Sequence, residues 1–296
     1  MKVSGFILLC LVPLLGFAEE DWTWWNTRHG WQPGMRDWRG MMHITPGYLG
    51  PNALPVPEMK KGIITPGASI ELSADFHFRS GDPTQNIWAK YYRSFAEDRI
   101  AIEFYGVLLE HYAMSDSIRD QRIARDYNGK GFAMGDFYFT TLVQLIKDKK
   151  FPDTMLRLAG RTASGGQLEA ARYSDSPGYF IDISFSKEYA SSREKVFFRP
   201  YTSMGFYSWQ TNDDLNLQND AYLYGVGADV RGSHWLISNS LSGYSGYKQE
   251  RDRPMVYTFD LNRSFKKHTL RFQYLHGLRD WTYQTVKLSV IWNLRK

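Results

Sequence analysis

A serine in a glycine-rich turn is the first candidate for chemistry in this chain. Ser164 follows a predicted strand and precedes Gly165 and Gly166. A serine hydroxyl is a weak nucleophile unless a neighbouring base takes its proton. None of the seven histidines is marked by its spacing as that base, although one from another strand could serve, since catalytic triads are defined by geometry. Two interpretations therefore stay open, a nucleophile and a structural turn, and the sequence favours the turn.

Motifs for metal ions and phosphate groups are sparse. The run Asp126-Tyr127-Asn128-Gly129 resembles the start of a calcium loop, but the third acidic position and the terminal Glu are missing, which favours a β-turn. Lys130-Gly131 is not preceded by the spacing of a Walker motif. The single cysteine, Cys10, falls in a segment that we expect to be removed, so no thiolate is left for zinc or a disulfide. The sequence predicts no metal and no cofactor.

The first eighteen residues predict a cleaved signal peptide. Lys2 supplies a positive start, Phe6 to Leu15 is an apolar stretch, and Gly16-Phe17-Ala18 has the small-x-small pattern of a cleavage site. An apolar stretch of about ten residues is too short to cross a hydrocarbon core of roughly 30 Å, which argues against a membrane anchor. We therefore expect export of the chain from the cytoplasm and removal of residues 1–18.

Composition excludes some classes of function. Aromatic residues make up 16% of the chain, and such side chains favour pleated sheets and membrane–water interfaces. The mean hydropathy of −0.44 would suit a soluble protein, but a barrel escapes that test because lipid-facing and lumen-facing residues alternate. Loss of Lys2 changes the formal charge from +5 to +4. This excess is too small to indicate nucleic acid.

The segment after the signal peptide differs from the rest. Half of the prolines and half of the tryptophans lie between positions 21 and 66, and proline cannot donate to a β-ladder. We expect three parts: a signal peptide at 1–18, an irregular N-terminal arm or plug at 19–66, and an outer-membrane β-barrel at 67–296. The arm should pack against the barrel's periplasmic mouth or enter its lumen, above all between Trp38 and Pro57. A leader packed on a rim stays open as an alternative.

From Ala68 onward apolar and polar residues alternate, as in strands with two different faces. Ile70 and Phe76 share one face of the first strand, and Val286, Val290 and Trp292 share one face of the last. We predict an all-β, antiparallel transmembrane barrel of about 12 strands (10–14). The strands should lie near 68–79, 86–95, 99–112, 136–147, 153–163, 178–188, 194–209, 219–230, 233–246, 254–265, 268–278 and 286–294.

The connections support this architecture. Turns such as 265–268 are short, whereas the polar links at 113–135, 164–177 and 210–218 are longer, a rhythm typical of periplasmic turns and extracellular loops. A helix within 115–127 is an alternative, but the segment is highly charged and we interpret it as a loop. The predicted location is the cell outer membrane. Expected partners are outer-membrane lipids, lipopolysaccharide and the barrel-assembly machinery, with a protein partner at the arm left open.

Three segments carry a family resemblance: 50–57 (GPNALPVP), 135–139 (GDFYF), and the run from 161–165 to 176–180. With them the chain resembles a family of uncharacterised Gram-negative outer-membrane β-barrel proteins, which implies the fold and no mechanism. The architecture is also similar to outer-membrane phospholipase A, a twelve-stranded family with a His two residues before its nucleophilic Ser. Thr162 stands at that position before Ser164, which puts the activity in doubt.

The inward face of the predicted barrel carries charges of both signs. A selective ion pore would more naturally show a ring of one sign, so we predict a structural barrel or a narrow channel for small polar solutes. An enzyme is the less favoured hypothesis, and the alternative is a lipid hydrolase that uses Ser164. The predicted lumen-lining residues are Glu71, Asp75, Arg79, Glu103, Arg157, Arg161, Asp182, Arg199, Asp229, Asp260, Arg271 and Lys287.

Overall fold

The computed structural model describes residues 21–147, 150–191 and 195–294. The predicted signal peptide lies outside these residues. The chain divides into two compact units, Met1–Met35 and Arg36–Lys296. Among the described residues, no helix is both long enough and apolar enough to span a membrane.

The first unit contains one short helix, α1 (Thr23–His29). It ends at Gly30, whose left-handed backbone (φ 68°) is easily adopted by glycine, and whose N–H donates to the carbonyl of Asn26. Trp25 is buried, with its ring 6.5 Å from that of Trp31.

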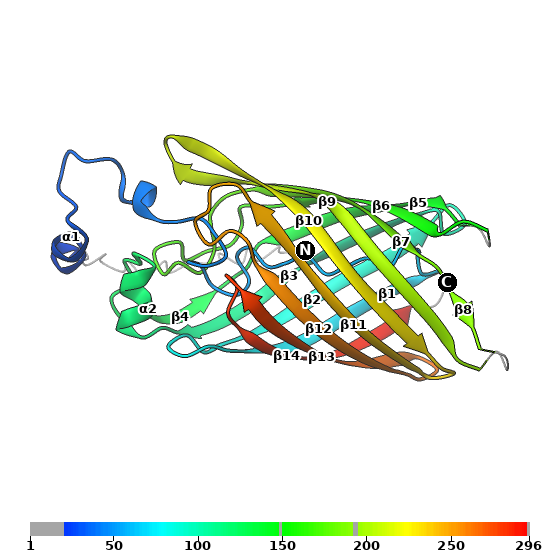
Figure 1. Ribbon diagram of the computed structural model, residues 1–296. Coiled ribbons are helices and arrows are strands. Elements are labelled where there is room, and N and C mark those ends of the chain that lie inside the picture. Colours follow the sequence, from blue (N-terminus) through cyan, green and yellow to red (C-terminus); the bar gives the residue numbers. More distant parts are fainter. Residues whose placement is uncertain (1–20, 148–149, 192–194, 295–296) are drawn as a thin grey trace, which may run out of the picture. The chain divides into compact units, whose positions relative to one another are not determined.

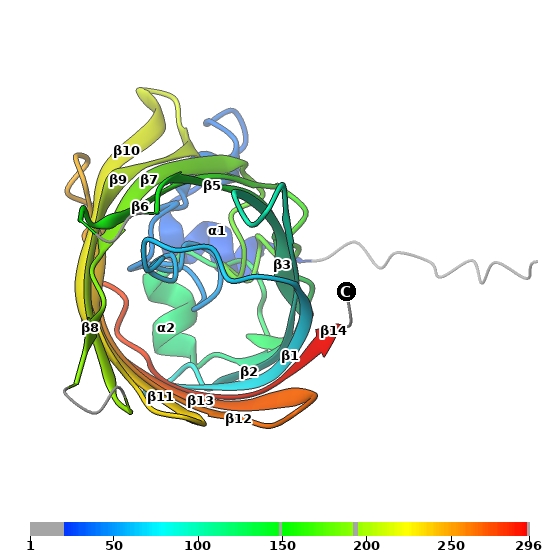
Figure 2. The ribbon, with the colours of Figure 1, turned by 90° about the vertical axis from the view of Figure 1, so that its right-hand side faces the viewer.

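The second unit is a closed antiparallel barrel of twelve long strands within the described residues (Figures 1 and 2). Closure comes from pairing of the first strand with the last over eleven residue pairs, from Ala68↔Leu294 to Phe78↔Gln284. The strands are β1 (Ala68–Phe78), β2 (Thr84–Phe95), β3 (Ile100–Ala113), β5 (Phe137–Ile146), β6 (Asp153–Arg161), β7 (Gly178–Ser186), β9 (Phe197–Asp213), β10 (Asn216–Arg231), β11 (Trp235–Gly246), β12 (Met255–Ser264), β13 (His268–Arg279) and β14 (Gln284–Leu294).

The predicted fold class and strand count are confirmed, and two local predictions are wrong. The polar stretch 210–218 forms the tip of the β9–β10 hairpin, with a turn of only Asp214 and Leu215. At this tip β9 and β10 pair only with each other and extend beyond the rest of the barrel, so both faces of the hairpin can carry polar residues. The charged stretch 115–127 contains a helix, α2 (Asp116–Gln121), which Ser115 caps by accepting from the N–H of Ile118.

Three smaller elements complete the second unit. β4 (Lys130–Ala133) pairs with β3, and β8 (Tyr189–Ala190) pairs with β9. A 3-10 helix, η1 (Trp38–Met41), begins at Asp37, whose side chain accepts from the N–H of Arg39. The arm is otherwise irregular, as expected for a stretch rich in proline.

Along the strands the apolar side chains are the exposed ones and the polar side chains are the buried ones, which is the reverse of the pattern in a soluble protein. In β1, Ile70, Phe76 and Phe78 are exposed, at 42%, 38% and 56%, while Glu71 and Asp75 between them are 2% exposed. Large apolar side chains thus cover the outside of the barrel and polar ones face its interior. So large an exposed apolar surface is unfavourable in water, whereas it is the surface that a barrel needs inside a lipid bilayer.

The two mouths of the barrel differ. One, the short-turn mouth, has the connections 96–99, 232–234 and 265–267, together with the described residues 147, 150–152, 187–191 and 195–196 of two further connections. The other, the long-connection mouth, has 79–83, 114–136, 162–177, 214–215, 247–254 and 280–283, and it holds α2 and β4 (Figure 1). In outer-membrane barrels long loops face outward and short turns face the periplasm.

Candidate functional site

The lumen is occupied by part of the arm, residues 42–66, which we call the strap (Figure 2). It starts at the long-connection mouth, where Gly47 donates its N–H to the carbonyl of Arg251 (3.1 Å). Gly50 then donates to the carbonyl of Ala171 (2.9 Å). At its start the strap therefore meets the wall at the long-connection mouth and not at the short-turn mouth, which is the one expected to face the periplasm.

The strap continues through the barrel to the short-turn mouth. Arg161 on β6 donates to the carbonyl of Ala53 (2.6 Å), and Arg157, four residues earlier on the same strand, donates to that of Glu58 (2.8 Å). Ile64 donates its N–H to Gln144 of β5 (2.7 Å). Immediately after the strap, Gly67 donates to Ser94 at the end of β2 (2.8 Å), and β1 begins. The strap thus passes the full length of the lumen.

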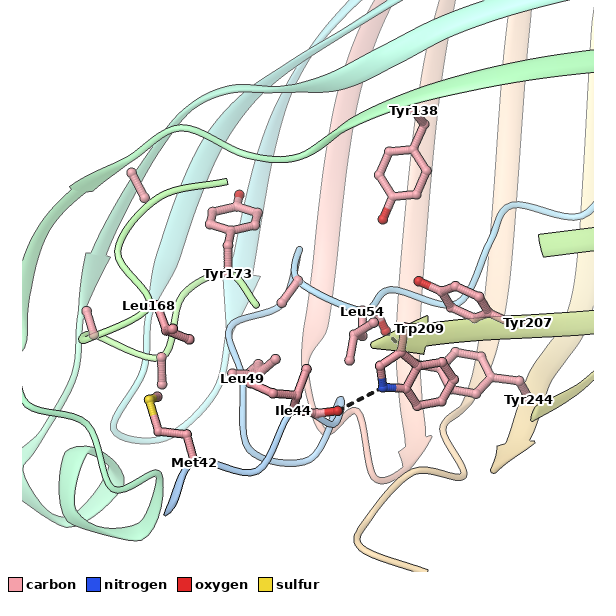
Figure 3. Close-up of a cluster of buried hydrophobic side chains, with 14 of the residues drawn as sticks. Met42, Ile44, Leu49, Leu54, Tyr138, Leu168, Tyr173, Tyr207, Trp209 and Tyr244 are labelled. Carbon is pink, nitrogen blue, oxygen red and sulfur yellow. Dashed lines mark hydrogen bonds between the residues drawn. The ribbon is translucent and has the colours of Figure 1, made fainter. Parts of the chain in front are cut away.

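Apolar packing closes the long-connection mouth. The cluster joins Ile44, Leu49 and Leu54 of the strap to Trp209 and Tyr244 of the wall (Figure 3). The indole N–H of Trp209 donates to the carbonyl of Ile44 (2.8 Å), and the hydroxyl of Tyr244 donates to that of Leu54 (2.7 Å). Both hydrogen bonds use strap carbonyls that would otherwise be buried without a partner.

A buried ion cluster ties the connections of this mouth together. The guanidinium of Arg172 donates to Glu110 (2.7 Å) and Asp82 (2.9 Å), and Arg122 also donates to Asp82 (2.6 Å). Burial raises the pKa of Asp82, but the two guanidiniums outweigh burial and hold that pKa below its ordinary value of 3.8. Arg172 also packs against Gly50, where a side chain would meet the guanidinium at 2.8 Å.

The predicted lumen-lining residues divide by burial. The six acidic ones and three of the basic ones, Arg157, Arg161 and Arg271, are at most 9% exposed. The other three, Arg79, Arg199 and Lys287, are half-buried. A balanced set of charges therefore lines the interior of the described barrel.

Several predicted residues pair with each other. Arg157 donates to Asp182 (2.5 Å), and Lys287 lies 3.3 Å from Asp75. Arg271 joins two predicted acids, with N–O distances of 2.6 Å to Asp260 and 3.3 Å to Glu71.

Other predicted residues have partners that the sequence did not single out. Arg161 pairs with Asp136 (3.3 Å) and Arg199 with Glu188 (2.9 Å). Arg79 lies over the ring of Tyr283, 5.4 Å from its centroid.

Three charged residues of the strap were missed by sequence reasoning. Glu58 pairs with Arg271, Lys60 pairs with Glu103 (2.6 Å), and Lys61 pairs with Asp229 (2.8 Å). A cluster of charges in a stretch otherwise rich in proline and apolar residues was the available signal. Each strap charge meets a wall charge of opposite sign, so the strap and wall match electrostatically as well as in shape.

Cavities lie beside the strap, and two of them are large enough to hold water or a small solute. A cavity of about 470 Å³ lies at the short-turn mouth, lined by strap residues from Glu58 onward and by residues of every long strand except β7. A second, of about 170 Å³, lies deeper, where Trp88, Tyr105 and Phe180 add aromatic faces. Seven residues line both cavities: Glu58, Met59, Lys60, Lys61, Lys90, Glu103 and Asp260.

Ser164 lies in the 162–177 connection and lines neither cavity. Its hydroxyl is 2.7 Å from that of Thr162 and 3.5 Å from the carbonyl of Gly135, and neither group is a base. His77, inside the barrel, is hydrogen bonded to Thr285 and Asn86 (both 2.7 Å). Within the described ranges, no three His, Cys, Asp or Glu side chains gather as metal ligands.

No family model and no curated protein matches the chain. Among solved structures it is similar to an outer-membrane channel from Pseudomonas putida F1, with a TM-score of 0.53 and 11% identity over 81% of this chain and 100% of that one. The NanC porin (TM-score 0.48, 8% identity, 76% and 100% covered) and the KdgM porin (0.46, 7%, 76% and 99%) are also similar.

At these identities the likeness is one of fold. The chain has the fold of a Gram-negative outer-membrane β-barrel, and its apolar outer face gives it a lipid environment in that membrane. The predicted fold class and location are confirmed.

Proposed function

We propose that this barrel is a narrow channel for small polar solutes and that the strap is its plug. The observation that carries the proposal is the pair of cavities beside the strap, about 470 and 170 Å³, which share seven lining residues, six of them charged. Buried polar side chains are costly in a purely structural interior unless they are paired. Here they are paired, yet they still surround space that water and a small solute can enter.

The proposed path is blocked at one end. The apolar cluster around Ile44 and Trp209 fills the long-connection mouth, and the Arg172 ion cluster holds the connections over it. Passage of a solute therefore requires the strap to shift or leave. The strap's contacts are hydrogen bonds and ion pairs between irregular backbone and wall, with no strand pairing to the barrel, which makes such a shift physically reasonable.

Recordings in planar bilayers test the proposal. The mature chain should show rare, small openings, and the same chain without residues 21–60 should conduct steadily. Folding of both is checked by the heat-dependent shift of the folded band on gels, and we expect the deletion to lower its heat resistance. A folded deletion variant that never conducts would overturn the channel and favour a structural barrel.

The other functional hypotheses have less support. The lipid hydrolase would need a base beside Ser164, whose hydroxyl neighbours are Thr162 and a backbone carbonyl. Lipopolysaccharide around the outer face and the barrel-assembly machinery during insertion stay as proposed partners. A protein partner at the Trp-rich N-terminal segment also stays a proposal, and it would gain weight if deletion of the arm changed neither stability nor conductance.

A further inference from the structure

We infer that the lumen wall carries a binding site for a small organic cation with a primary ammonium group, and that Lys61 of the strap fills this site in the structure. The inference rests on the proposed channel and names the class of solute that it would take. The strap would then act as an internal substitute for the solute, and a cationic solute would compete with it for the wall.

The surroundings of Lys61 are those of an ammonium site. Its Nζ lies 2.8 Å from a carboxylate oxygen of Asp229 and 3.2 Å from the hydroxyl of Ser238. The ring of Tyr201 lies 5.4 Å from the same nitrogen, and its hydroxyl is 2.8 Å from that of Ser238. A carboxylate, a hydroxyl and an aromatic face are the groups that recognise an ammonium.

This site belongs to the wall and not to the strap. Tyr201, Asp229 and Ser238 lie on β9, β10 and β11, three neighbouring strands, and Asp229 and Ser238 are directly paired across the ladder. Asp229 is 5% exposed and Ser238 3%. Rigid strands therefore hold the groups in place whether or not the strap is present.

A second carboxylate supports the same conclusion. Glu103 accepts from Lys60 through one oxygen (2.6 Å), while its other oxygen, Oε2, is buried without a hydrogen-bond partner among the described residues. A buried carboxylate oxygen normally has a donor. Glu103 lines both cavities, so an ammonium or other donor in the cavity could fill this position.

The charge balance of the wall points the same way. The wall of the larger cavity presents five carboxylates, Glu71, Glu103, Glu188, Asp229 and Asp260, against four cations, Lys90, Arg199, Arg231 and Arg271, which leaves −1. Arg199 is directly opposite Asp229 in the ladder, and both Arg199 and Arg231 pair with Glu188. Without the strap this lumen favours cations.

Binding is tested by calorimetry on the full-length mature chain folded in detergent. The probe is butylammonium, which copies the lysine side chain, and n-butanol is its neutral counterpart. Lys61→Ala should bind butylammonium, and the double variant Lys61→Ala/Asp229→Asn should bind it roughly tenfold more weakly or not at all. The wild type and the exposed-turn control Lys266→Ala should not bind it.

Equal binding of butylammonium and n-butanol by Lys61→Ala, or no effect of Asp229→Asn, would overturn the inference. If Lys61→Ala does not fold, Lys61→Met with methylammonium as the probe asks the same question, because methionine preserves the apolar stem.

Conductance separates this inference from the channel itself. The full-length Lys60→Met/Lys61→Met variant should prefer K⁺ over Cl⁻ in the reversal potential. Butylammonium binding without conductance in any variant would overturn the channel and keep the site. Conductance without cation preference, together with absent binding, would keep the channel and overturn the site.

Discussion

Replacing Arg172 with Met should destabilise the connections of the long-connection mouth. The side chain is fully buried, and its guanidinium donates to Glu110, Asp82 and Thr84 at 2.7, 2.9 and 2.9 Å. Methionine keeps most of the apolar stem, which isolates the loss of charge and hydrogen bonds. The change leaves two buried carboxylates with one fewer partner each.

The magnitude follows from what remains. Removing one partner of a buried ion pair costs about 3–5 kcal/mol. Asp82 keeps Arg122 at 2.6 Å, and Glu110 keeps Asn52 at 2.7 Å, so we expect the lower end, about 3 kcal/mol.

Urea unfolding in detergent, followed by far-UV circular dichroism, measures this loss. The matched control is Arg279→Met, whose side chain is 56% exposed and lies 3.8 Å from its acidic partner, and which should cost less than about 1 kcal/mol. A free energy of unfolding for Arg172→Met equal to that of the control would refute the assignment of the ion cluster as the lock on this mouth.

Three other outcomes are expected. Val290→Arg places a charge on the lipid face of β14 and should cost roughly 2–4 kcal/mol near the midplane, read from urea unfolding in lipid vesicles, and a neutral effect would contradict that face. Because Arg172 and Arg122 keep the pKa of Asp82 below 3.8 against the effect of burial, its contribution should persist above about pH 4 and be lost as pH falls through the lowered pKa. Asp82→Asn should flatten this acid limb of the unfolding curve, and an unchanged limb would argue against it. Trp209→Phe removes the hydrogen bond to Ile44 and should cost about 1–3 kcal/mol and speed proteolysis of the strap, while unchanged proteolysis would show that this contact does not hold it.

Much of the barrel could be predicted from local sequence. A strand with lipid outside and charges inside must alternate, and β1 and β14 do so with few exceptions. A bulge is harder to foresee: between Ile87 and Trp88 the register of β2 against β3 shifts because β3 carries one extra residue, Leu108, which leaves Leu108 and Leu109 both exposed.

The site was less accessible, because its contacts join residues far apart in sequence. Lys60 meets Glu103 across 43 positions and Lys61 meets Asp229 across 168. The strap has no periodicity from which its register against the wall could be derived. The same limit applies to Arg161, whose acidic partner, Asp136, was not among the predicted lumen-lining residues and lies in the link before β5.

One measurement tests the plugged channel most directly. It uses a single introduced thiol, because the only cysteine of the sequence, Cys10, lies in the predicted signal peptide and the mature chain is expected to have none. Ser240→Cys places a thiol at the deeper cavity. A water-soluble cationic thiol reagent is added to one side or the other of vesicles in which orientation is known from protease cleavage of the long connections. The intact chain should react only from the short-turn side, and the chain without residues 21–60 should react from both. Reaction of the intact chain from the long-connection side, or from neither side, would contradict the account.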